Sequence, residues 1–294
     1  MLSAAIFGIS NIVDSHLISK RLPGLKVYLL LTSLVYLVYI GIFPTLFPLP
    51  EALTMRVFLI TAASTLLRVI GIIIMLFAFK REEASRVVPI VHTYPIIVAI
   101  LAIPILGESL QYLHWLAIFL VVIGATMTSA KENPFGYFTF RSKALLFPLI
   151  SSLLYAMADI MGKYVLGYIS FWDLYWFNII SFAGVSLAIS LRPSTFRELA
   201  CMNQKMGAII LIVFNEIMVP AAIILHFLAL QRGPVSLVSA ILSSRPLFVL
   251  IGSVMVNYFR PGIIQWYSGG KVMLVTRFVA IAMIVGGITI VNLN

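Results

Sequence analysis

The sequence predicts an all-helical, polytopic membrane protein whose ten spans form a 5+5 inverted repeat. Three observations lead to this prediction. First, 62% of the 294 residues are hydrophobic, 10% are charged and the mean hydropathy is +1.09, whereas soluble domains carry about 25% charged residues. Second, ten apolar runs are long enough to cross a bilayer. Third, the second half of the chain repeats motifs of the first half.

The ten runs were delimited by charges and by Pro or Gly clusters, since a hydrocarbon layer about 30 Å thick needs about 20 apolar residues per helix. They cover residues 1–19, 27–47, 56–79, 87–106, 112–129, 144–166, 171–191, 207–230, 235–258 and 277–293. The period-two alternation of a membrane β-barrel is absent from them. The first run lacks a basic start and contains Asn11, Asp14 and His16, so we expect a mature helix and not a signal peptide.

Charge and cysteine content exclude several function classes. The net charge is +10, but Lys and Arg fall in twos and threes between apolar runs and form no basic patch for nucleic acid. The single cysteine, Cys201, excludes an intramolecular disulfide and any cysteine-based metal site. No other metal-ligand spacing is present in the sequence. We therefore expect no cofactor, and the lipid bilayer and a small molecule as partners.

An internal repeat indicates how the spans are organised. At an offset of 151 residues, 77–95 aligns with 228–246, which places Arg81 on Arg232 and Pro95 on Pro246. We predict a first repeat at 1–130, a linker at 131–142 and a second repeat at 143–294. Because five spans per repeat is an odd number, the second repeat must cross the membrane in the opposite sense. Inverted repeats of this kind favour transport by alternating access.

Several motifs give the chain a family resemblance. Residues 77–85 read Phe-Ala-Phe-Lys-Arg-Glu-Glu-Ala-Ser, and Pro95 and a Leu-Gly-Glu at 106–108 follow; residues 228–232 and Pro246 repeat part of this pattern. With these motifs the sequence resembles the EamA family of the drug/metabolite transporter superfamily. The resemblance implies a 5+5 bundle that moves small metabolites through a central cavity between its halves. Residues 256–258 depart from the family pattern, since they read Val-Asn-Tyr in place of Leu-Gly-Glu.

The distribution of Lys and Arg predicts the orientation in the cell (plasma or inner) membrane. Loops after the odd-numbered spans hold fifteen of these cations, and the other side holds Arg56 and Arg232. The fifteen are Lys20, Arg21, Lys26, Lys80, Arg81, Arg86, Lys131, Arg141, Lys143, Arg192, Arg197, Lys205, Arg260, Lys271 and Arg277. By the positive-inside rule both termini lie outside the cytoplasm. The family resemblance implies the opposite orientation.

Three cations lie within the apolar runs: Arg68, Lys163 and Arg245. A cation at mid-bilayer costs about 2.5 to 3.5 kcal/mol or more, so such residues usually face a polar interior. Three carboxylates, Asp14, Asp159 and Glu216, could balance them. Asp159 and Lys163 share a helix face at i, i+4 and are candidate partners. Two interpretations stay open, a structural set of ion pairs and a role in binding substrate or protons.

Other polar and helix-breaking residues complete the candidate substrate site. The polar candidates are Asn11, His92, Tyr94 and Asn215. Pro95, Pro246 and Pro220 each remove a backbone donor inside a span, as a hinge or gate does. A serine face at 236, 239 and 243 fits close helix packing and cavity lining equally well.

The charges also favour a class of substrate. Arg68 and Arg245 would hold a carboxylate or phosphate, and Glu216 could receive an ammonium group or couple transport to a proton or ion. Amino acids and small organic or phosphorylated anions therefore rank above cationic drugs. A lipid or lipid-precursor flippase is the nearest alternative. An intramembrane enzyme would need Asp14 to meet Asp159, and we expect Lys163 to keep Asp159 ionised.

The remaining patterns are interpreted as structural. Small-residue pairs at Gly124 with Thr128 and at Ala282 with Gly286 predict helix-packing seams, and an oligomer could form through the fifth and tenth spans. His16, His114 and His226 are isolated in the sequence, so we expect packing or interfacial roles for them.

Overall fold

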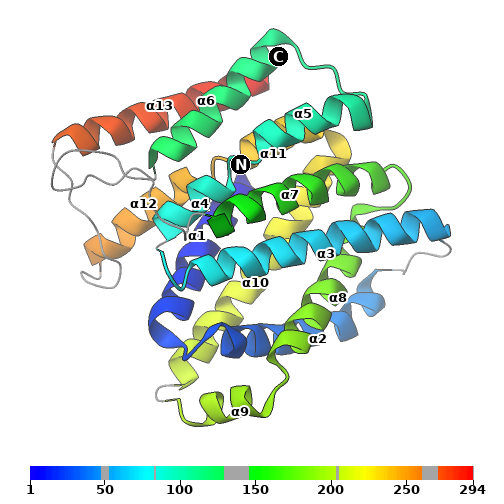
Figure 1. Cartoon of the computed structure of the whole chain (residues 1–294), viewed down its shortest axis with the longest axis vertical. Coiled ribbons are helices and arrows are strands. Elements are labelled where there is room, and N and C mark those ends of the chain that lie inside the picture. The colour runs from blue at the N-terminus through cyan, green and yellow to red at the C-terminus, as the bar shows by residue number, and fades with distance from the viewer. Residues whose placement is uncertain (48–52, 83, 129–145, 203–204, 260–270, 294) are drawn as a thin grey trace.

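The computed structural model describes residues 1–47, 53–82, 84–128, 146–202, 205–259 and 271–293, and all regular secondary structure in them is helical. The helices are α1 (Leu2–His16), the π-helical η1 (Leu17–Arg21), α2 (Leu25–Leu46), α3 (Met55–Ala78), α4 (Ala84–Val91), α5 (Pro95–Leu106), α6 (Tyr112–Thr128), α7 (Leu146–Val165), α8 (Phe171–Ser190), α9 (Pro193–Ala200), α10 (Lys205–Arg232), α11 (Val235–Leu242), α12 (Arg245–Phe259) and α13 (Lys271–Leu293) (Figure 1). The expected linker at 131–142 lies outside the described residues.

Eight segments of the described chain are long and apolar enough to cross a membrane, and α6 and α13 each contain a shorter apolar helix. The spans follow the apolar runs closely because hydropathy sets their length. For example, the run predicted at 207–230 is α10, and that at 171–191 is α8. The short helix α9 lies in a connection for which we predicted no helix. The chain is therefore a polytopic helical membrane protein.

Helices from the two halves of the chain pack against each other in a reciprocal pattern. The helix α3 packs along α7, and α1 packs along α10; α2 packs against α8, and α6 against α13. The last pair lies side by side at one edge of the molecule (Figure 1). A Cβ added at Gly124 would lie 2.7 Å from the Ala280 carbonyl oxygen, and one at Gly287 would lie 2.8 Å from the Ala117 oxygen. Glycine thus permits the close approach of α6 and α13.

This contact corrects one predicted seam. Gly124 lies in the α6–α13 interface as expected, but a Cβ at Gly286 would meet open space. The glycine that faces α6 is Gly287, one residue further along α13. A shift of one residue turns a helix by about 100°, so the spacing of small residues found a seam but placed it on the wrong face.

Two predicted spans are each broken into two helices near the middle. The run at 87–106 divides into α4 and α5, and the run at 235–258 divides into α11 and α12. Pro95 is the first residue of α5 and Pro246 the second residue of α12. Proline has no N–H to donate and its ring clashes with the preceding helical turn, so each break falls just before a proline. Pro220, in contrast, lies inside α10, which continues past it.

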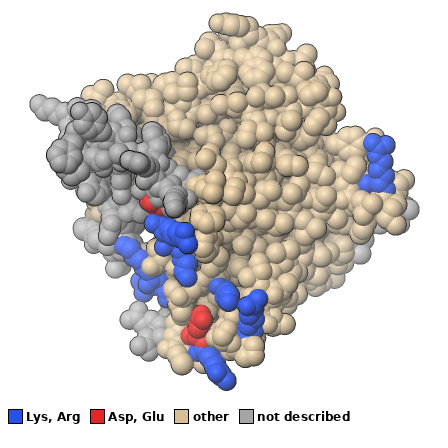
Figure 2. All heavy atoms as spheres, viewed as in Figure 1, with Lys and Arg blue, Asp and Glu red and all other residues tan. Residues whose placement is uncertain are grey.

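Charged side chains are unevenly distributed over the face that Figure 2 shows. On the face in Figure 2, Lys and Arg gather toward the end of the molecule that carries α9, with one further group at the opposite edge and a broad uncharged surface between. Many large hydrophobic residues are exposed, including Leu34, Leu59 and Ile210. An uncharged apolar belt between charged ends is what a lipid-facing surface requires.

Candidate functional site

A cavity with about 860 Å³ of empty space, counting the part open to solvent, lies among α1, α2, α3, α7, α8, α10 and α12. Eight of the ten side chains predicted to bind substrate line it: Asn11, Asp14, Arg68, His92, Tyr94, Asp159, Glu216 and Arg245. They come from helices far apart in the sequence. Polar residues that were isolated within apolar runs thus converge on one place in the bundle.

One end of the cavity holds a set of mutually bonded groups that we call the arginine cluster, made of Arg68, Asp159 and His226. Arg68 Nη2 donates to Asp159 Oδ1 at 2.6 Å, and its Nη1 lies 3.2 Å from His226 Nε2. The same histidine nitrogen lies 3.1 Å from Asp159 Oδ1. All three residues are buried and come from α3, α7 and α10. In the cluster, Arg68 and Asp159 neutralise each other's charge.

Arg245 lies at the start of α12, beside the helix break. Its guanidinium carbon lies 3.9 Å from the centre of the Phe7 ring on α1, a cation–π contact. Among the described residues, no carboxylate oxygen comes within 4.0 Å of it, and its Nε has no hydrogen-bond partner. Arg245 therefore presents an unneutralised positive charge to the cavity.

A second group of ionisable side chains, which we call the acidic pair, is formed by Asp14 and Glu216. Tyr28 Oη lies between them, 2.7 Å from Asp14 Oδ1 and 3.4 Å from Glu216 Oε1. Asp14 also accepts bonds from Asn215 Nδ2 at 2.8 Å and from Ser10 Oγ at 3.2 Å. Both carboxyl groups are buried, and no Lys, Arg or His nitrogen within the described ranges lies within 4.0 Å of either.

Several buried polar atoms in the cavity wall have no hydrogen-bond partner among the described residues. They include Asn11 Nδ2, Asn178 Nδ2 and both ring nitrogens of His92. Buried polar groups normally find partners, since an unmade hydrogen bond costs about 1 to 3 kcal/mol. The wall therefore offers donors and acceptors to a polar molecule inside the cavity.

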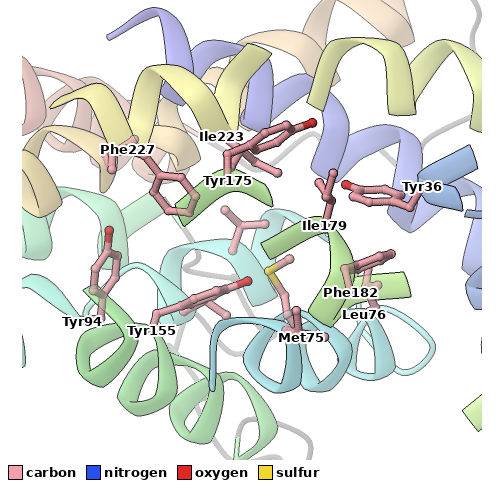
Figure 3. Close-up of a cluster of buried hydrophobic side chains, with 14 of the residues drawn as sticks. Tyr36, Met75, Leu76, Tyr94, Tyr155, Tyr175, Ile179, Phe182, Ile223 and Phe227 are labelled. Atoms are coloured by element: carbon pink, nitrogen blue, oxygen red, sulfur yellow. The ribbon is translucent and has the colours of Figure 1, made fainter. Parts of the chain in front are cut away.

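The rest of the wall is apolar and aromatic. In Figure 3, Ile223 and Phe227 of α10 lie on one side of a group of buried hydrophobic side chains, and Tyr94, Tyr155 and Met75 lie on the other. Further apolar residues on the lining are Phe7, Ile72, Leu76, Phe182 and Val219. A cavity with polar groups at a few points and apolar walls between them suits a small molecule with charged ends and an apolar body.

The expected pairing of Asp159 with Lys163 is wrong. Asp159 bonds to Arg68, while Lys163 Nζ donates to the carbonyl oxygens of Leu230 and Gly233, both at 2.7 Å. Lysine has a long flexible stem, so its ammonium group reaches the last carbonyls of α10, where the helix dipole attracts a cation. Lys163 does not line the cavity.

The start of α11, the next helix after α10, is also capped by a charged side chain. The Glu108 carboxylate accepts bonds from the backbone N–H of Val235, at 2.5 Å, and from the Ser236 hydroxyl and N–H. It thus caps α11, while Lys163 caps the end of α10. Ser236, Ser239 and Ser243 are buried outside the cavity lining, so their face serves packing.

Some residues of the cavity were not anticipated. His226, expected to be a packing histidine, contacts both Arg68 and Asp159. Tyr28, Tyr36, Tyr155 and Asn178 also line the cavity. The eight-residue spacing of Tyr28 and Tyr36 places them about 80° apart around α2, within one broad stripe, a signal that could have identified them. Asn215, in contrast, does not line the cavity but supports Asp14.

Comparisons with known proteins agree with the fold. Residues 1–130 match the model of the EamA-like transporter family, which confirms the sequence resemblance. Twenty-seven chains of solved structures match. One of these, a crystal structure, aligns with a TM-score of 0.68 at 14% identity, over 98% of this chain and 94% of that chain. At this identity the match shows the fold alone. No curated protein matches the chain.

Proposed function

Because residues 1–130 carry the pattern of the EamA-like transporter family, we propose that the chain is a secondary transporter that moves a small zwitterionic metabolite by alternating access. The family match supports a membrane transporter. The substrate class and the mechanism rest on the charges and packing described above.

We infer ten spans in two inverted repeats, at 1–130 and 143–294. The reciprocal packing supports this, since the contact of α3 with α7 corresponds, with the two repeats exchanged, to the contact of α10 with α1. The two helix breaks, before Pro95 and Pro246, fall at repeat-related positions. Such breaks give each repeat a place to bend around a central site. The two breaks are therefore the proposed hinges.

The charge distribution in the cavity carries the substrate proposal. Arg245 is a cation without a carboxylate partner among the described residues, and the acidic pair consists of carboxyl groups without a cation there. A zwitterion satisfies both, with its carboxylate on the Arg245 guanidinium and its ammonium on Asp14 and Glu216. A simple anion or a simple cation satisfies only one of the two ends.

The spacing of the two ends adds a length requirement. Arg245 lies over Phe7, and Asp14 is seven residues further along α1, which is about 10 Å of helix rise. Side chains reaching from both ends shorten this span. Apolar walls between the ends fit an aliphatic body, so 6-aminohexanoate, whose ammonium and carboxylate are separated by five methylene groups, is a suitable first probe.

We also propose that both termini face away from the cytoplasm, because the Lys and Arg of the sequence lie mainly in loops on one side. A green fluorescent protein that folds only in the cytoplasm, fused after Asn294, tests this orientation. The fusion should be dark. Bright cells would reverse the orientation and leave the cavity proposal unchanged.

Counterflow in liposomes tests the transport proposal. Vesicles that contain the purified protein and unlabelled 6-aminohexanoate should accumulate labelled 6-aminohexanoate, and Arg245→Gln should abolish the accumulation. Arg197→Gln is a matched control because this exposed arginine lies on α9, away from the cavity. Folded Arg245→Gln that exchanges 6-aminohexanoate as the parent does would refute the proposed site. Movement of a labelled phospholipid in place of 6-aminohexanoate would favour the flippase.

A further inference from the structure

The acidic pair has a property that the transport proposal does not use. Two buried carboxyl groups share one hydroxyl, with no basic nitrogen within 4.0 Å in the described chain. We propose that Asp14, Tyr28 and Glu216 form a proton-binding site that holds one proton, and that the ammonium group of the substrate competes with this proton. The second part of the proposal rests on the transporter function; the first part does not.

The hydrogen bonds around Tyr28 require the proton. A phenol has a single O–H to donate, and an ionised carboxylate can only accept. Tyr28 Oη lies 2.7 Å from Asp14 Oδ1 and 3.4 Å from Glu216 Oε1, so it can donate to one of them only. The other contact becomes favourable when that carboxyl group carries a proton and donates to the Tyr28 oxygen.

The surrounding contacts place the proton on Glu216. Asp14 accepts three bonds, from Tyr28, Asn215 and Ser10, which is the environment of an ionised carboxylate. Glu216 has fewer donors, with Tyr36 facing its carboxyl group and Tyr39 donating to its backbone oxygen. Two like charges in a low-dielectric interior cannot both remain ionised at little cost. One proton on Glu216 removes this repulsion.

The other charged groups near α10 do not replace that proton. On α2 and α8 the facing groups are Tyr28, Tyr36, Tyr39 and Tyr175, all uncharged as phenols. On α7, Asp159 is occupied by Arg68. The cations of η1, Lys20 and Arg21, are exposed at the surface.

A charge count of the cavity lining agrees. The lining contains two arginines, Arg68 and Arg245, and three carboxyl groups, Asp14, Asp159 and Glu216. The third cation expected from the sequence, Lys163, lies elsewhere. One bound proton makes the lining neutral, with His226 uncharged.

The exchange step is simple in chemical terms. The O–H bond of the Glu216 carboxyl group breaks, its proton passes to water, and both carboxylates then accept N–H bonds from the entering ammonium. One positive charge leaves the acidic pair as another arrives. Each substrate bound therefore releases one proton, which would couple substrate movement to proton movement in the opposite direction.

Infrared spectroscopy of the purified protein without substrate tests the proton site. The parent should show a protonated-carboxyl C=O band at neutral pH that disappears on raising the pH, and Glu216→Gln should lack this band. Glu198→Gln, an exposed control on α9, should keep it. Asp14→Asn removes the neighbouring negative charge, so the affinity of Glu216 for its proton should fall by a factor of about ten or more.

Three results would overturn the site: no band in the parent at neutral pH, a band that survives Glu216→Gln, or an unchanged titration in Asp14→Asn. The folding of Glu216→Gln is a further check, because glutamine imitates a protonated glutamic acid. This variant should give the parent's folded yield.

Proton release tests the competition. The amide 6-aminohexanamide, which has an ammonium but no carboxylate, should release about one proton per molecule bound in weak buffer, and 6-acetamidohexanoate, which lacks the ammonium, should release none. No release on binding of 6-aminohexanamide would refute competition. If the infrared band is present but counterflow of 6-aminohexanoate fails, the transport proposal is wrong and the proton site stands; the converse result removes the proton site alone.

Discussion

The arginine cluster and the acidic pair lie in one cavity but differ in how their charges are balanced. In the cluster, Arg68 meets Asp159 directly and the two charges cancel. In the acidic pair, Asp14 and Glu216 are like groups separated by one phenol. The first arrangement is complete in the protein itself. The second is completed by a proton or by a positively charged ligand, and this difference distinguishes a structural set of charges from a binding set.

The two regions are joined by one helix. His226 of the cluster and Glu216 of the acidic pair are both on α10, ten residues apart, which is about 15 Å of helix rise. Across the cavity, α3 and α7 hold the cluster while α1 and α2 hold the acidic pair. A displacement of α10 relative to these helices would therefore change both regions together.

Removing one partner of the cluster should have the largest effect on stability. Asp159→Ala leaves the Arg68 charge buried without a partner, and such losses cost about 3 to 5 kcal/mol. Thermal unfolding in detergent would measure the loss. The double variant Arg68→Gln with Asp159→Asn should recover much of it, because no lone charge remains. A double variant as unstable as Asp159→Ala would contradict the pairing.

The two members of the acidic pair should respond differently to conservative substitution. Asp14→Asn replaces an ionised acceptor of three bonds with an amide, and we expect a loss of about 1 to 3 kcal/mol. The free energy of unfolding of Glu216→Gln should lie within about 0.5 kcal/mol of the parent's, because glutamine imitates a protonated glutamic acid and no hydrogen bond is lost. Equal losses in the two variants would remove the distinction between an ionised Asp14 and a protonated Glu216.

A smaller effect is expected at Lys163, which lies outside both regions. Lys163→Gln shortens the donor that reaches the carbonyl oxygens of Leu230 and Gly233, so it should cost about 1 kcal/mol. The ratio of the affinities for 6-aminohexanoate and 6-aminohexanamide should stay at the parent's value. A changed ratio would show that Lys163 acts on the substrate after all.

The sequence predicted the spans well because hydropathy over about 20 residues is a property of the chain alone. It also identified most polar residues of the cavity, since a charge inside an apolar run must face protein or water. The partner of each charge depends on tertiary packing. Asp159 and Lys163 share a helix face, yet Asp159 binds Arg68 of α3. The flexible side chain of Lys163 extends to the end of α10 instead.

Aromatic and histidine residues were harder to place from the sequence. Tyr28 and His226 occur in apolar stretches where packing and cavity lining give the same pattern. Only the arrangement of α2 and α10 around the cavity distinguishes these two roles. The helix breaks are an intermediate case, because a proline indicates where a helix can break but not that it does, as Pro220 inside α10 illustrates.

The most direct test of the account measures the affinity of the purified parent for 6-aminohexanoate, 6-acetamidohexanoate and 6-aminohexanamide, together with Arg245→Gln. If Arg245 and the acidic pair hold opposite ends of one zwitterion, removing either charge from the ligand should weaken binding by about 10- to 100-fold, the equivalent of a charged hydrogen bond of about 1.5 to 3 kcal/mol. Arg245→Gln should bind 6-aminohexanoate and 6-aminohexanamide with similar affinity, because the carboxylate has lost its partner. Equal affinities of the parent for all three ligands would contradict the central claim.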